Sequence, residues 1–69
     1  MTHYQESIIK ITGCTETDAP EIESYMRDIV FHSTLDWQPK ALFNKGAKEA
    51  WSDIQWMRSP EGIAYMATL

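Results

Sequence analysis

The chain has 69 residues, of which 43% are hydrophobic, with three Trp, three Tyr and two Phe, which excludes a disordered tail and predicts one folded domain over 1–69. The net charge of −4 argues against a dedicated nucleic-acid binder, because phosphate contacts dominate that affinity. A single cysteine, Cys14, rules out an internal disulfide and indicates a reducing compartment.

The charge is spread unevenly along the chain. Seven acidic residues against Lys10 and Arg27 give residues 1–36 a net −5, whereas three acidic residues against three lysines and Arg58 give residues 37–69 a net +1. No charged and apolar leader opens the printed sequence, and no apolar run approaches the roughly 18 residues of a membrane span. We therefore expect a cytoplasmic protein with no membrane partner.

A first helix is predicted near 3–12. Thr2 and Gln5 form a capping-box pattern, in which each side chain bonds a free backbone N–H at the helix start. Gly13 stands where a residue in the left-handed conformation commonly ends a helix. The β-branched residues within 7–12 leave a strand open as the alternative.

A second helix is predicted near 19–32. Asp18 and Glu21 make another capping pair at its start, and Glu23 and Arg27 are placed one turn apart on its outside. Apolar residues recur at helical spacing and predict a buried stripe of Ile22, Tyr25, Met26, Ile29 and Val30.

A connector over 32–38 leads to the longest predicted helix, near 38–58. Within it, Gly46, Ala47 and Ala50 form a small-residue patch that would let a neighbouring backbone approach closely. A glycine inside a helix costs about 1 kcal/mol relative to alanine, so a packing reason is expected. The alternative is a tolerated surface glycine.

A short fourth helix over 60–69 is predicted from Ser59 and Pro60, which resemble an N-cap and a first-turn residue. If the segment is instead extended, the alternating residues of 63–69 would pair with 7–12 in a small α+β unit.

The predicted fold class is therefore all-α, a compact bundle of three to four helices, with the small α+β unit as the rival. The apolar positions that face inward in this arrangement form the predicted core: Ile8, Ile11, Ile22, Tyr25, Met26, Ile29, Val30, Leu35, Phe43, Ala47, Ala50, Trp51, Ile54 and Met57.

No residue constellation in the sequence demands a chemistry. His32, Ser33 and Asp36 are the residue types of a hydrolase triad, but they are neighbours in one loop, whereas a triad is assembled from separated segments. His3 and His32 could share a metal with Cys14, but the three residues lack zinc-site spacing. We predict a protein that is not an enzyme, with no catalytic residue, metal or cofactor, and keep an undetected enzyme as a second alternative.

Charged residues on the third helix support two further interpretations. Glu49 and Asp53 lie one turn apart and are interpreted as part of a solvated charged face. Lys40, Lys45 and Lys48 form a basic strip, so the first alternative function is a small helical nucleic-acid-binding protein.

Trp56 stands out on the same helix. At about 100° per residue it falls away from the side of Phe43 and Ile54 and toward Lys45 and Glu49. Either the N-terminal segment or the last ten residues cover this ring, or it is an exposed anchor for a partner or a second copy. The predicted partner-binding residues are Trp56, Lys45, Glu49 and Lys48.

The run from Phe31 to Trp37, FHSTLDW, resembles a stretch in small uncharacterised proteins encoded by phages and plasmids. This resemblance implies a small accessory protein that binds a host or viral component. The leading functional hypothesis is a non-enzymatic, acidic protein–protein interaction module, such as an accessory or inhibitor protein acting on a host component. Its expected partners are a protein of unknown identity and a second copy in a homodimer, because so small a core favours self-association.

Overall fold

The computed structural model describes residues 2–32 and 34–69, and in it the long helix α3 (Lys40–Arg58) contacts every other α-helix. Within the described part of the chain there are four α-helices and no strand, so the all-α prediction is confirmed and the strand pairing of 7–12 with 63–69 is wrong. The remaining elements are α1 (His3–Thr12), α2 (Ala19–Tyr25), the π-helical turn η1 (Met26–Val30), the 3₁₀ turn η2 (Leu35–Trp37) and α4 (Pro60–Ala67).

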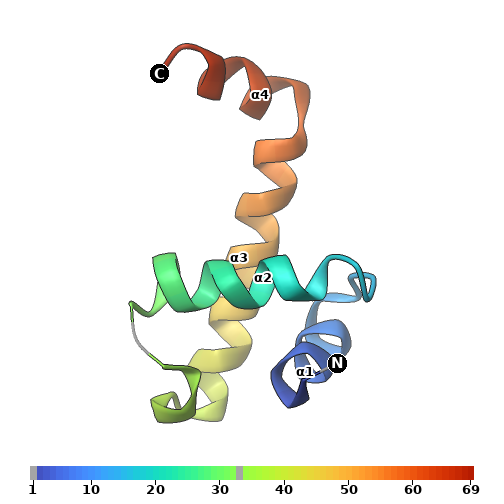
Figure 1. Ribbon diagram of the computed structural model, residues 1–69, viewed down its shortest axis with the longest axis vertical. Coiled ribbons are helices and arrows are strands. Elements are labelled where there is room, and N and C mark those ends of the chain that lie inside the picture. Colours follow the sequence, from blue (N-terminus) through green and yellow to red (C-terminus); the bar gives the residue numbers. More distant parts are fainter. Residues whose placement is uncertain (1, 33) are drawn as a thin grey trace.

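Three of the helices are in mutual contact, and the fourth packs mainly against one of them. α1, α2 and α3 pack on one another, with α2 drawn across the middle of α3 (Figure 1). Among the described elements, α4 packs substantially on α3 alone, at the end remote from η2 (Figure 1). A bundle of three to four helices therefore stays a prediction. No helix in the described ranges combines the length and the apolar content that a membrane crossing requires.

Local capping signals explain where two helices begin and where one ends. The Thr2 hydroxyl accepts a hydrogen bond from the Gln5 backbone N–H at 3.1 Å, and the Gln5 side chain accepts one from the Thr2 N–H at 3.2 Å. Gly13 has a φ of 75° and ends α1 as predicted. The Ser59 hydroxyl accepts a hydrogen bond from the Gly62 N–H at 3.1 Å and starts α4.

The capping pair expected at the start of α2 is wrong. Asp18 makes no side-chain cap, because its backbone is already helical (φ −82°, ψ −27°), whereas a capping residue usually has an extended backbone. Its carboxylate instead accepts hydrogen bonds from the Thr15 hydroxyl at 3.0 Å and from Arg58 at 2.9 Å. A contact remote in sequence has replaced the local one.

The predicted helix over 19–32 changes its pitch at Met26. The Phe31 N–H donates to the Met26 carbonyl at 2.9 Å, a bond that spans five residues and widens the turn. Ile29 is consequently 54% exposed, so its assignment to the core is wrong. Phe31, which lay outside the predicted core, packs against the buried cluster instead.

The core otherwise follows the predicted stripes. Ile11, Tyr25, Val30, Trp51 and Met57 lie at its edge and are partly buried. Cys14 and Ala19 are buried additions that the apolar spacing did not predict. The predicted core residues that are fully confirmed as buried are Ile8, Ile22, Met26, Leu35, Phe43, Ala47, Ala50 and Ile54.

The small-residue patch on α3 has the packing reason that its glycine implied. A Cβ on Gly46 would lie 2.6 Å from the ring atom Cζ of Phe31, which is closer than two carbon atoms can approach. Ala47 and Ala50 continue the same buried surface. The end of the α2–η1 segment therefore packs closely against α3 at Gly46. Gly46 is not a tolerated surface residue.

Two isoleucine-to-alanine substitutions separate the observed core from the predicted one. Ile54→Ala should lower the free energy of unfolding by about 2–5 kcal/mol, because Ile54 is only 1% exposed. Ile29→Ala should lower it by less than about 1 kcal/mol, because the π-helical turn leaves that side chain largely in solvent. Urea unfolding measures both, and equal losses would contradict the turn at 26–30.

Candidate interaction surface

α4 is joined to α3 through a contact between backbones. Gly62 is buried, and a Cβ built on it would lie 1.9 Å from the Trp56 carbonyl oxygen and 2.8 Å from the Met57 Cα. Only a glycine allows this approach. Because the contact uses main-chain atoms, it leaves most side chains of α4 free to face outward.

Large apolar side chains gather where α3 ends and α4 begins. The rings of Trp56 and Tyr65 pack with centroids 5.6 Å apart and planes tilted by 60°. Ile63 and Met66 are one helical turn apart on α4 and are neighbours on its surface, and Leu69 follows the end of the helix. We name this set the C-terminal apolar surface, whose members are between 44% and 82% exposed: Trp56, Ile63, Tyr65, Met66 and Leu69.

The C-terminal apolar surface is also free of charge over most of its extent. The segment 62–69 contains no acidic or basic side chain, in a chain whose net charge is −4. Groups of exposed large apolar side chains without charges are typical of places where another molecule binds.

Trp56 lies within this surface, as the angular argument from the sequence indicated. Its side chain is 44% exposed, and its ring packs against that of Tyr65, in the last ten residues. The interpretation that the last ten residues contact this ring is therefore confirmed in part. Its role in partner binding stays a prediction.

The other three predicted partner-binding residues lie elsewhere on α3. Lys45, Lys48 and Glu49 are all exposed, and Glu49, the nearest in sequence, precedes Trp56 by about 10 Å along the helix axis. Within the described residues, none of the three makes an ion pair. The structure does not bring them onto the C-terminal apolar surface, and their roles also stay predictions.

Sequence reasoning missed most of this surface. Ile63, Tyr65, Met66 and Leu69 were weighed only as helix against strand. The signal that could have identified them was the eight-residue stretch 62–69 without a charge, beside a tryptophan that faces away from the core.

Arg58, next to this surface, links the end of α3 to the start of α2. Arg58 bonds the carboxylates of Asp18 and Glu21 at the start of α2, and its guanidinium lies 5.7 Å from the ring centre of Trp51. The hydrogen bond from Arg58, assisted by that from Thr15, holds the pKa of the Asp18 carboxyl below its usual range. These bonds fix the end of α3, from which α4 departs.

The structure describes only some of the residues considered for catalysis or metal binding. Ser33, the centre of the sequence His32, Ser33 and Asp36, lies outside the described residues. In the described ranges no group of three His, Cys, Asp or Glu side chains is close enough to share a metal ion. Asp53 accepts a hydrogen bond from the Tyr25 hydroxyl at 3.0 Å, which together with the larger effect of burial raises the pKa of Tyr25.

Comparison of the chain with protein-family models, with curated proteins and with solved structures finds no match. The resemblance of residues 31–37 to phage and plasmid proteins therefore stays a prediction. The function has to be argued from the surfaces of this chain alone.

Arg58→Gln should raise the pKa of Asp18 toward its usual value near 3.8, because the charge-assisted bond is lost. A depressed folded pKa stabilises the fold above the unfolded value, and this stabilisation is lost as pH falls through the folded pKa. The wild type should therefore unfold at higher urea than the variant at neutral pH, and the difference should shrink as pH falls below about 4. Carboxyl NMR titration measures the pKa. Arg27→Gln, which removes the pair with Glu23 instead, should leave Asp18 unchanged.

Gly62→Ala should detach α4 from α3, because the added methyl group would overlap the Trp56 carbonyl. Amide hydrogen exchange should become faster along α4 and stay unchanged in the cluster around Ile8 and Ile54. Helix propensity alone predicts the opposite sign, since alanine favours a helix over glycine by about 1 kcal/mol. Slower exchange in α4 of the variant would contradict the backbone contact.

Proposed function

We propose that this protein is a non-enzymatic protein–protein interaction module that docks its partner on the C-terminal apolar surface. The observation that carries the proposal is the exposure of Trp56 and Tyr65 as a packed ring pair, flanked by the outward-facing apolar residues of α4. Tryptophan and tyrosine are enriched among the residues that contribute most to protein interfaces. A surface of this composition favours a protein as the ligand.

The magnitude of the apolar contribution indicates what else such a complex needs. Burying one fully exposed large apolar side chain contributes about 1.5–3 kcal/mol, and about two-fifths of the surface of these five is already covered on average. Association costs an estimated 4–15 kcal/mol in lost freedom of motion. The C-terminal apolar surface alone therefore supports a weak complex, and the acidic residues of the first half would add attraction to a basic partner.

The biological setting of this proposal is a small acidic accessory or inhibitor protein, of the type that phages and plasmids encode, acting on a host component in the cytoplasm. The resemblance of residues 31–37 and the single Cys14 support that setting. A homodimer is a second assembly that the same surface would form, because a charge-free patch can face its own copy without repulsion.

A nucleic-acid ligand is the second candidate, favoured by one observation. Lys40, Lys45 and Lys48 are all exposed, and none makes an ion pair with another described residue. If these three lysines contact phosphates, the logarithm of the affinity should fall with the logarithm of salt concentration with a slope of about −3. The net charge of −4 opposes this candidate.

Trp56→Ala should abolish partner binding while the monomer still folds. We expect a stability loss of about 1 kcal/mol, because the ring pair with Tyr65 disappears. The amount of partner protein that the immobilised chain retains from source-cell extract should fall by about tenfold or more, because an interface anchor is lost. Quantitative mass spectrometry measures the retained proteins, and urea unfolding measures the stability.

Trp37→Ala is the matched control. Trp37 is 80% exposed on η2, at the other end of α3, so its removal makes the same chemical change far from the C-terminal apolar surface. Binding should survive in this variant. If both tryptophan variants lose or keep the same proteins, the C-terminal apolar surface is not the docking site.

A further inference from the structure

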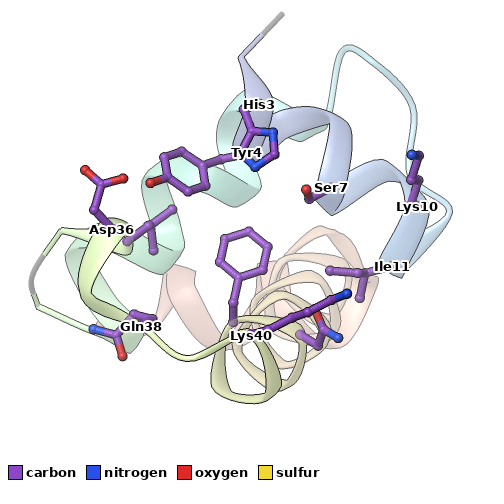
Figure 2. Close-up of a pocket in the computed structure, with 11 residues that line it drawn as sticks. His3, Tyr4, Ser7, Lys10, Ile11, Asp36, Gln38 and Lys40 are labelled. Atoms are coloured by element: carbon purple, nitrogen blue, oxygen red, sulfur yellow. The ribbon is translucent and has the colours of Figure 1, made fainter.

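A groove of about 700 Å³ lies between α1, η2 and the first turns of α3 (Figure 2). It is remote from the C-terminal apolar surface, because its α3 residues, Lys40, Phe43 and Asn44, precede Trp56 by at least 12 positions, about 18 Å along the helix. Its volume falls within the range of about 300–1,000 Å³ that small-molecule sites in proteins occupy.

The lining of the groove includes an apolar base. Tyr4 and Ile11 of α1 face Phe43 of α3, and Leu35 of η2 closes the base. The rings of Tyr4 and Phe43 lie 5.9 Å apart with their planes tilted by 34°. Leu35 and Phe43 are nearly buried, so the base is the outer edge of the core and is held rigidly. An aromatic ring or a short acyl chain matches such a base.

Two lysines from different helices line the groove and give it positive charge. Lys10 comes from α1 and Lys40 from the start of α3, and within the described residues neither makes an ion pair. Lys10 also borders a neighbouring hollow with Glu6 and Glu16, so Lys40 is the cation that belongs to this groove alone. In Figure 2 the Lys40 side chain runs toward the side where Ile11 and Lys10 are drawn, whereas Asp36 lies at the opposite side. The Asp36 carboxylate already accepts a hydrogen bond from the Thr34 hydroxyl at 3.3 Å.

The backbone of α3 adds to the same positive potential. Pro39 precedes the helix and provides no side-chain cap, so the first N–H groups next to Lys40 keep their partial positive charge. A cation at this end of a helix is unfavourable by itself, and an anion bound beside it would offset both effects.

We propose that this groove binds a small carboxylate with an aromatic or acyl body, the carboxylate between Lys10 and Lys40 and the body on Tyr4, Ile11 and Phe43. Charge contributes to the selection, because Lys10 and Lys40 outnumber Asp36 among the charged side chains that line the groove. The site is independent of the interaction module proposed above, since the two surfaces share no residue.

Titration of the ¹⁵N-labelled chain with 4-phenylbutyrate tests the site by NMR. The amide shifts should saturate at α1 and at the first turns of α3, with the roughly millimolar affinity typical of a ligand of this size. The neutral analogue 4-phenylbutan-1-ol has the same body without the charge and should bind at least about threefold more weakly. Equal binding of the alcohol, shifts centred on α4, or no saturation by about 10 mM would each overturn the proposal.

Paired substitutions locate the charge that acts. The double variant Lys10→Gln, Lys40→Gln should weaken 4-phenylbutyrate binding by about tenfold and bring its affinity near that of the alcohol. The matched control Lys45→Gln, Lys48→Gln makes the same change in net charge on the outside of α3 and should shift the affinity less than about twofold. Equal weakening in both double variants would show a response to net charge alone and would overturn the site.

Discussion

The contact between Gly46 and the ring of Phe31 determines how the rest of the chain can pack. A single methyl group on Gly46 would sit 2.6 Å from that ring, so the close approach exists only because the side chain is absent. Ala47 and Ala50 extend the same narrow surface along α3 and are fully buried. In a chain of 69 residues, these small residues let the helices pack at short distance. Larger side chains at the same positions would push the helices apart.

The π-helical turn is what delivers Phe31 to that contact. In a regular α-helix, a residue five positions after Met26 would point about 140° away from it and would miss the core. The bond from the Phe31 N–H to the Met26 carbonyl widens the turn, so that both side chains meet the buried cluster. Ile29 faces outward as a result. It fits the helical spacing of the buried stripe, yet it is exposed on the surface.

Features that depend on neighbouring residues could be predicted from the sequence, whereas features that depend on contacts remote in sequence could not. Thr2, Gly13 and Ser59 were read correctly, because a cap depends on atoms within one helical turn. Asp18 was not, because its partner Arg58 is brought to it only by the finished fold. The turn at Met26 likewise places Phe31 beside Gly46, on another helix. Trp56 could be placed from its angle alone, whereas the groove between α1 and α3 required their relative position.

The way α4 is attached explains why the chain presents an apolar surface there. At Gly62 the contact is made by main-chain atoms, so it does not consume the apolar side chains that normally hold a helix to its neighbour. Tyr65 packs against Trp56, and Ile63 and Met66 are each more than half exposed.

The two ends of α3 consequently differ in how they would select a ligand. The C-terminal end offers the exposed apolar side chains of Trp56 and α4, next to Arg58, and would discriminate by shape. The N-terminal end offers a smaller apolar base beside Lys10 and Lys40 and would discriminate by charge. Because the acidic residues of the first half repel anions at long range, an anion gains at the N-terminal end only when its apolar body is also accommodated. The two requirements together make that end selective.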